Sequence, residues 1–242
     1  MRPRQPASRL PASTKEAAVS LRARFFALTY DRMGAKTEKA GLQARRRDLL
    51  AEASGRVLEI GGGTGANLPF YGSAVESLTL TEPEPPMLRR LERRAQDEVP
   101  LAKVLRAPAE DLPFDDDSFD TAVSTLVLCG VDDQPRALRE LRRVLRPGGR
   151  LLFIEHVRSD EPGLARWQDR LNVVNRVVAC CECNRPTLDS IKAAGFEVAH
   201  VEHTTLEKVP PFVRPLIVGA AVAAPGAPSR YASIGETSGT AV

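Results

Sequence analysis

Short aliphatic runs alternate with longer amphipathic stretches from residue 56 onward. The aliphatic runs predict five strands, at residues 57–60, 78–81, 103–106, 120–124 and 150–155. The clearest helical stretch between them covers residues 135–145, where apolar residues recur on one face and Pro135 stands in the first turn. Residues 147–149 then read Pro-Gly-Gly, which predicts the end of this helix and a turn into the next strand. The alternation predicts a parallel sheet with helices on both faces.

Different patterns flank this alternating region. Residues 15–52 space their apolar side chains as a helix does and predict a helical segment before the sheet. Residues 164–178 predict another helix, whose apolar face packs in the core, lines a substrate pocket or leans on a membrane surface; we favour the substrate pocket. Residues 196–203 and 214–222 predict two final strands that pair antiparallel at the end of the sheet.

The composition is that of a soluble globular protein. Of the 242 residues, 43% are hydrophobic and 27% are charged, enough to bury a sizeable core. A formal net charge of +3 and only 5% aromatic residues argue against nucleic-acid binding, which uses basic stripes and stacking side chains. No run approaches the ~18 apolar residues that span a bilayer, and residues 1–14 lack the apolar stretch of a signal peptide. We therefore expect a cytoplasmic protein without an integral membrane segment.

A glycine cluster directly after the first predicted strand is the strongest sign of a ligand site. Residues 57–65 read Val-Leu-Glu-Ile-Gly-Gly-Gly-Thr-Gly. The glycines at Gly61, Gly63 and Gly65 let the backbone turn sharply and come close to a ligand. Gly61 and Gly63 also satisfy the dinucleotide pattern together with Ala66, so the glycines alone do not identify the cofactor.

Two carboxylates near the glycines narrow the choice of cofactor. Glu59 stands two residues before Gly61, where it would repel a pyrophosphate but suits a ligand with an amino group and a sulfonium. Its alternative role is to cap nearby backbone amides and shape the loop. Glu82 ends the next predicted strand, 21 residues after Gly61, where an acid can accept both ribose hydroxyls. A nucleoside with a cationic amino-acid tail is S-adenosyl-L-methionine, whose demethylated product is S-adenosyl-L-homocysteine.

Three of the four cysteines crowd together, at Cys180, Cys181 and Cys183. Their spacing raises a zinc or arsenic hypothesis. A second ligand pair at metal spacing is missing, and Cys129 is isolated in the sequence. We therefore expect free cysteines and no metal site.

Several motifs in order resemble the class I S-adenosylmethionine-dependent methyltransferases with a type 11 methyltransferase domain. They are residues 57–65, Glu82-Pro83, 109–114, 118–120 and 145–149. A narrower likeness points to the methyltransferase-like-7 group, the thiol S-methyltransferases and their bacterial relatives. It is carried by residues 125–129, 155–157, 184–185 and 213–215. Animal members of that group have a hydrophobic N-terminal membrane anchor; this sequence shows no such stretch, so we do not expect membrane attachment.

The resemblance implies an α/β fold: a Rossmann-like, seven-stranded, mostly parallel sheet with the last strand antiparallel, helices on both faces and an N-terminal helical lid. Many members have an acid where this chain has Pro108. We therefore expect the adenine to rest on backbone at Ala109 and Glu110 and on packing against Met87. The expected cofactor-binding residues are Glu59, Gly61, Gly63, Gly65, Glu82, Met87, Ala109, Glu110 and Thr125.

His156 is the sharpest catalytic candidate, because it follows Glu155 at the end of a central strand, near the expected position of the methyl group. Its alternative is a structural histidine. A thiol with a pKa near ~8.5 ionises without a strong base, so a small-molecule thiol is the favoured acceptor. The alternatives are O-, N- or C-methylation of a lipid, quinone or natural-product intermediate, a catalytically silent S-adenosylmethionine-binding partner protein, or a nicotinamide oxidoreductase, which Glu59 disfavours.

The expected organisation is one domain over residues 15–223. It comprises a helical lid at 15–52, a cofactor-binding core at 56–155, and substrate-side helices and final strands at 156–223. Tyr30 and Asp31 are candidates to close over the cofactor from the lid. The small, polar ends, residues 1–14 and 224–242, predict disordered tails. The oligomeric state stays open.

Overall fold

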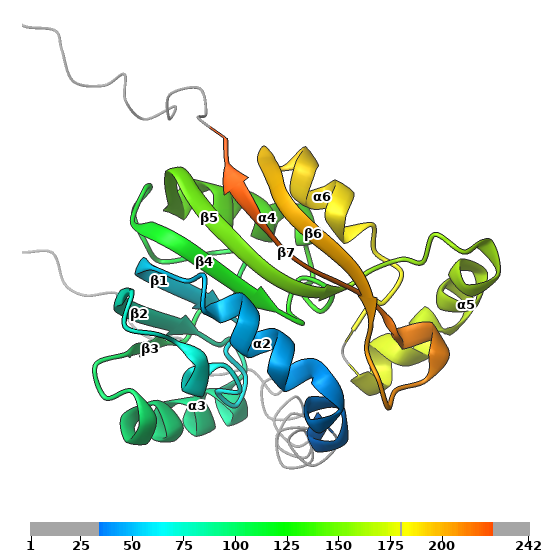
Figure 1. Cartoon of the computed structure of the whole chain (residues 1–242), viewed down its shortest axis with the longest axis horizontal. Coiled ribbons are helices and arrows are strands. Elements are labelled where there is room, and N and C mark those ends of the chain that lie inside the picture. Colours follow the sequence, from blue (N-terminus) through cyan, green and yellow to red (C-terminus); the bar gives the residue numbers. More distant parts are fainter. Residues whose placement is uncertain (1–33, 180, 225–242) are drawn as a thin grey trace, which may run out of the picture.

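The computed structural model describes residues 34–179 and 181–224, and it is built around one seven-stranded sheet (Figure 1). The strand order is β3-β2-β1-β4-β5-β7-β6. The strands are β1 (Gly55–Ile60), β2 (Val75–Thr81), β3 (Lys103–Leu105), β4 (Phe119–Thr125), β5 (Leu145–His156), β6 (Phe196–Thr205) and β7 (Pro215–Ala223). Strand β7 is antiparallel to both of its neighbours, whereas the other neighbouring pairs are parallel. The predicted sheet, mostly parallel with an antiparallel last strand, is confirmed.

Helices cover both faces of the sheet. They are α2 (Gln43–Leu50), α3 (Pro85–Glu98), α4 (Gln134–Val144), α5 (Pro162–Ala179) and α6 (Thr187–Ala193). Three short elements join them: the π-helix η1 (Glu38–Leu42) and the 3-10 helices η2 (Leu68–Phe70) and η3 (Pro211–Val213). Apolar residues of α4 and α6 pack on one side of the central strands, and those of α2 and α3 pack on the other. Because the strands from β3 to β5 run parallel, their carboxyl ends lie at one edge of the sheet, where ligands gather in such folds.

The boundary between α4 and β5 differs from the prediction. The helix begins where expected, since the Asp133 side chain accepts a hydrogen bond from the Arg136 amide at 2.9 Å. It ends at Val144, however, and β5 already begins at Leu145. The Pro-Gly-Gly segment therefore lies inside the strand as an irregularity, because the register against β4 shifts there and Gly148 has φ 75°. Residues 146–149 have no partner in β4, and pairing resumes at Arg150, where the strand was predicted to begin, so the predicted turn falls within the bounds of β5 and not before them.

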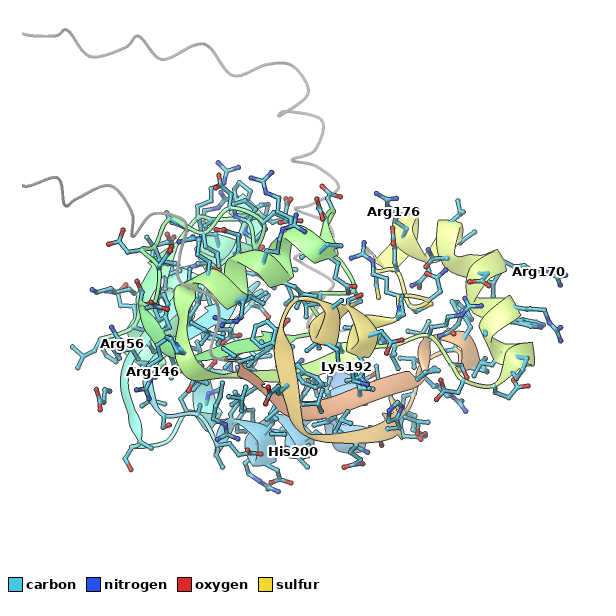
Figure 2. All side chains as sticks on the ribbon, turned by 90° about the horizontal axis from the view of Figure 1, so that it is seen from above. Arg56, Arg146, Arg170, Arg176, Lys192 and His200 are labelled. Carbon is cyan, nitrogen blue, oxygen red and sulfur yellow. The ribbon has the colours of Figure 1, made fainter. Side chains whose placement is uncertain are left out.

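Asp120 ties the opposite, amino-terminal edge of the sheet together. Its carboxylate accepts from the Arg56 amide at 2.7 Å and pairs with Arg146 at 2.7 Å (Figure 2). These contacts lie at the other end of the strands from the glycine loop. Asp120 therefore stabilises the strand entrance.

Helix α5 stands apart from the sheet's core (Figure 1). Its side chains Trp167 and Val174 are 61% and 59% exposed. Leu164 and Leu171 of the same predicted face are half-buried, so the face is partly open to solvent, and core packing is wrong for Trp167 and Val174. Within the described residues, no helix has the length and apolar character needed to cross a membrane. Tyr30 and Asp31, half of the predicted lid (residues 15–33) and the predicted tails, apart from Ala224, lie outside the described residues.

Candidate functional site

The loop after β1 adopts backbone conformations that suit glycine. Gly61 and Gly63 have φ values of 56° and 59°. A Cβ atom at Gly61 would lie 2.7 Å from the Val127 side chain, so the loop packs tightly against the segment after β4. A Cβ at Gly65 would lie 2.6 Å from Leu68, which makes this glycine a packing requirement. Gly63, by contrast, faces open space, since the nearest atom to an added Cβ is the Gly61 carbonyl oxygen at 3.9 Å.

Glu82 joins the glycine loop to the end of β2. One carboxylate oxygen accepts from the Gly63 amide and the other from the Glu84 amide, both at 2.9 Å. Burial raises the pKa of Glu82, and these two amides counteract part of that effect. The carboxylate therefore fixes the loop beside the position where the sequence analysis expects the ribose.

Glu59 is a buried carboxylate beneath the same loop. It accepts hydrogen bonds from the Asn67 amide group at 2.9 Å and from the Tyr71 hydroxyl at 2.6 Å. Burial raises the pKa of Glu59 to about 7, against the opposing effect of these bonds and of Arg46. The charged form of Glu59 is thus costly until a cation approaches it.

A polar cleft brings together four of the predicted residues with several that the sequence analysis missed. Its lining residues are Arg46, Glu59, Gly61, Gly62, Gly63, Thr64, Ala66, Asn67 and Thr125. Arg46 reaches it from α2 and donates to the Asn67 side-chain oxygen at 2.9 Å and to the Thr125 hydroxyl at 2.8 Å. Asn67 also donates to Thr125 at 2.9 Å. The residues Arg46, Asn67 and Tyr71 were not predicted, because nothing in their local sequence shows that they meet.

Three other predicted residues, Met87, Ala109 and Glu110, do not line the cleft. Met87 and Ala109 are buried, on α3 and on the segment after β3 respectively. The Glu110 carboxylate accepts from the amides of Asp132 and Asp133 at 2.8 and 3.2 Å. These bonds tie the segment after β3 to the start of α4, so the Glu110 side chain is engaged with backbone.

Glu155 organises the loop after β4. Its carboxylate accepts from the Ser124 hydroxyl at 2.7 Å. It also accepts from three successive backbone amides, those of Val127, Leu128 and Cys129, at 3.0 to 3.2 Å. Burial raises its pKa, and the hydrogen bonds oppose that effect. The sequence did not indicate a role for this strand-end acid. In the structure its carboxylate holds the loop after β4 in place.

His156 points to the opposite side of the sheet from Glu155, since neighbouring strand residues alternate. By the pairing of Thr125 with Ile154, this is the side on which Thr125 and α2 lie. Burial lowers the pKa of His156 to about 4, so the ring is neutral near pH 7. Its Nδ1 atom is buried and has no hydrogen-bond partner among the described residues. His156 is not among the residues that line the cleft.

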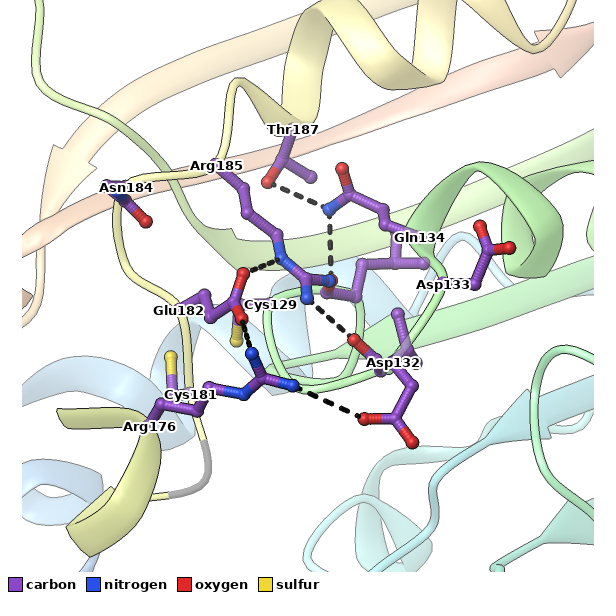
Figure 3. A network of polar contacts seen from close by, with 12 residues as sticks. Cys129, Asp132, Asp133, Gln134, Arg176, Cys181, Glu182, Asn184, Arg185 and Thr187 are labelled. Atoms are coloured by element: carbon purple, nitrogen blue, oxygen red, sulfur yellow. Dashed lines mark hydrogen bonds and ion pairs between the residues drawn. The ribbon is translucent and has the colours of Figure 1, made fainter. Parts of the chain in front are cut away.

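The loop after β4 is also held from the α5–α6 connection (Figure 3). Arg185 donates to the carbonyls of Leu128 and Val131 at 2.8 and 2.7 Å, and Glu182 pairs with Arg185 at 2.9 Å. The Glu182 amide donates to the Cys129 carbonyl at 2.8 Å. This brings together two segments that are more than 40 residues apart in the sequence.

Cys129 packs with Cys181 and Cys183 in a buried cluster, although sequence distance had suggested that it is isolated. A hydrogen bond with Cys181, with burial, raises the pKa of the Cys129 thiol. All three are free thiols. In the part of the chain that the structure describes, no three His, Cys, Asp or Glu side chains are placed to hold a metal ion. Cys180 lies outside the described residues.

Comparisons with known proteins give the chemical context. Residues 58–153 match the family profile described as "Methyltransferase domain". The chain is 34% identical over 192 residues to thiol S-methyltransferase TMT1B of Homo sapiens, covering 74% of this chain and 76% of that protein. It is 32% identical over 126 residues to phosphatidylethanolamine N-methyltransferase of Cereibacter sphaeroides, covering 48% and 62%. A solved Thermotoga maritima structure, titled a possible histamine N-methyltransferase, has a TM-score of 0.62 at 25% identity and covers 83% and 97%.

Proposed function

The chain belongs to the class I S-adenosylmethionine-dependent methyltransferases, and we propose that it transfers the methyl group to the sulfur of a small-molecule thiol. The observation that carries the proposal is the 34% identity over 192 residues to a protein named a thiol S-methyltransferase. That similarity extends beyond the matched methyltransferase domain at residues 58–153. The proposal includes a cytoplasmic location and an acceptor that is not a nucleic acid.

The charges along the cleft suit the amino-acid tail of S-adenosylmethionine. The open side of Gly63 gives a ligand access to backbone, and Glu59 offers a carboxylate to the ammonium group. We assign Glu82 to the ribose hydroxyls, and Met87, Ala109 and Glu110 to the surroundings of the adenine. Gly61, Gly65 and Thr125 complete the proposed cofactor-binding set.

Positioning is the main task of the protein in this reaction. When bound, S-adenosylmethionine would supply a methyl group on a sulfonium sulfur: the ionised acceptor sulfur would form a bond to the methyl carbon as the bond from that carbon to the sulfonium sulfur breaks, leaving S-adenosylhomocysteine. The residues of the chain have to hold the acceptor in line with that methyl group and exclude water. Glu155 contributes by fixing the loop after β4, whose amides it binds.

We assign His156 an assisting role at the acceptor. Its ring is neutral near pH 7, because burial lowers its pKa to about 4, and its Nδ1 atom can accept a hydrogen bond. A thiol acceptor needs only this weak assistance, since a fraction of its molecules is already ionised near neutral pH. A hydroxyl or protonated amine would need a stronger base. This chemistry favours sulfur as the methylated atom.

A lipid amine is the second candidate acceptor. It is supported by the 32% identity over 126 residues to a protein named phosphatidylethanolamine N-methyltransferase. That relative matches a smaller share of this chain, 48% against 74% for the thiol enzyme. The thiol therefore remains the first choice.

An acceptor panel tests the proposal. The purified full chain is incubated with S-adenosylmethionine and with small alkyl and aryl thiols, phenols, amines and phosphatidylethanolamine vesicles, and products are identified by mass spectrometry. We expect methyl thioethers from the thiols and, at a limiting cofactor concentration, much less of them from a matched Glu82→Ala variant. Methylated amine, phenol or lipid without thioether contradicts the thiol assignment. Binding of S-adenosylhomocysteine with no product from any acceptor would point to a silent partner protein.

A further inference from the structure

Arg46 is a buried cation in the wall of the glycine-loop cleft. It lies on α2 and is only 4% exposed. Its Nη1 atom donates to Asn67 and Thr125, and its Nε atom donates to Glu38 at 3.2 Å. Within the described residues, Nη2 has no hydrogen-bond partner. The guanidinium is thus paired with one carboxylate, that of Glu38, and its Nη2 atom is left to donate to a further anion in the cleft.

Asn67 stands between this cation and Glu59. Its side-chain oxygen accepts from Arg46 and its amide group donates to Glu59, each at 2.9 Å. The single amide thus spaces a positive and a negative side chain along one cleft, and both side chains line it. Opposite charges held apart in this way match a ligand that carries both an ammonium and a carboxylate group.

The amino-acid tail of the cofactor is such a group. We propose that Arg46 binds the carboxylate of the methionine tail while Glu59 faces its ammonium group. The carboxylate would also add a second negative charge beside the guanidinium, which already pairs with Glu38, and so reduce its repulsion of the sulfonium. The inference rests on the cofactor and not on the identity of the acceptor.

The assignment predicts that the site distinguishes ligands by their carboxylate. S-adenosyl-3-thiopropylamine is S-adenosylhomocysteine without that carboxylate and with the amine retained. Loss of a charge-assisted, paired contact typically weakens binding about 10- to 100-fold. We expect the wild-type chain to prefer S-adenosylhomocysteine by about this factor.

Calorimetry on the full chain, without any acceptor, measures this preference in three variants. In Arg46→Gln, the two ligands should bind with nearly equal affinity, because the carboxylate has lost its partner. Arg46→Lys should keep part of the preference, as a point charge without the paired geometry. Arg45→Gln is the matched control, since this neighbour on α2 donates to Glu202 and Thr204 of β6 and should leave the preference unchanged.

Two outcomes would overturn the inference. One is equal affinity of the wild-type chain for the two ligands, a result that needs no variant to fold. The other is a loss in Arg46→Gln or Arg46→Lys that is the same for both ligands, since Arg46 would then only shape the loop. Neither outcome depends on which acceptor is methylated, so the thiol proposal stands or falls separately.

Discussion

Replacing Glu59 by Gln should stabilise the protein in the absence of cofactor at pH 8. Glu59 is buried and its pKa is raised from 4.5 to about 7. Between these two pH values the folded state binds more protons than the unfolded state, so stability falls as pH rises. The contribution that the protonated Glu59 carboxyl group makes to stability is fully present below about pH 4.5 and has been lost above about pH 7.

The size of the effect follows from the same pKa. A carboxyl group that ionises near pH 7 when folded and near pH 4.5 when unfolded costs about 3 kcal/mol at pH 8. Gln removes this cost. Because its side chain has only one acceptor oxygen, it also weakens one of the hydrogen bonds from Asn67 and Tyr71, which costs about 1 kcal/mol. The expected net gain is therefore about 2 kcal/mol at pH 8, turning into a loss of about 1 kcal/mol near pH 4.5.

Urea unfolding of the wild type and Glu59→Gln from pH 5 to pH 8 measures the difference in their free energies of unfolding. The contributions of other titrating groups cancel in this difference, because both proteins contain them. The advantage of the variant should grow with pH and disappear when saturating S-adenosylhomocysteine is added, because the ammonium group stabilises the charged carboxylate. Wild-type binding near pH 7 should also release a proton, seen as a binding heat that changes with buffer, whereas the variant should release none from this position. A constant difference between the two proteins across this pH range would refute the reasoning.

Three further variants test other parts of the site. Glu82→Ala should weaken S-adenosylhomocysteine binding at least about 10-fold by calorimetry with the fold retained, and unchanged affinity would remove the ribose assignment. His156→Ala should lower turnover more at acidic than at alkaline pH, where the thiol ionises by itself; a uniform loss, or none, rejects its role at the acceptor. Glu155→Ala should lower the free energy of unfolding by about 3–5 kcal/mol, because it orphans buried amides, while the exposed Glu197→Ala changes little. Similar urea midpoints for these last two variants would contradict the conclusion that Glu155 stabilises the loop after β4.

The predictable parts of the structure are those set by local periodicity. The strands follow from aliphatic runs of the right length, and α4 follows from its single apolar face and its Pro near the start. The start of β5 was predicted less well, because Leu145 pairs with Phe119 of β4 ahead of the Pro-Gly-Gly segment, and continuous pairing begins only at Arg150. The local turn signal is real, but the isolated pairing of Leu145 with another segment could not be read from it.

The unpredicted parts of the site depend on contacts between distant segments. Arg46 and Thr125 are 79 residues apart and Cys129 and Cys181 are 52 apart, yet each pair meets. No period or motif in one segment specifies its partner in another. The sequence therefore identifies the ligand-facing strand ends, such as Glu59, better than the residues that surround them.

Glu59 and Glu155 show why a strand-end carboxylate cannot be assigned from sequence alone. Both end a parallel strand, both are buried, and burial raises the pKa of each. A carboxylate can accept about four hydrogen bonds. Glu155 already accepts four from the chain itself, so little capacity remains for a ligand. Glu59 accepts two and lines the cleft, so it has capacity for further donors, such as the ammonium group that we propose it binds.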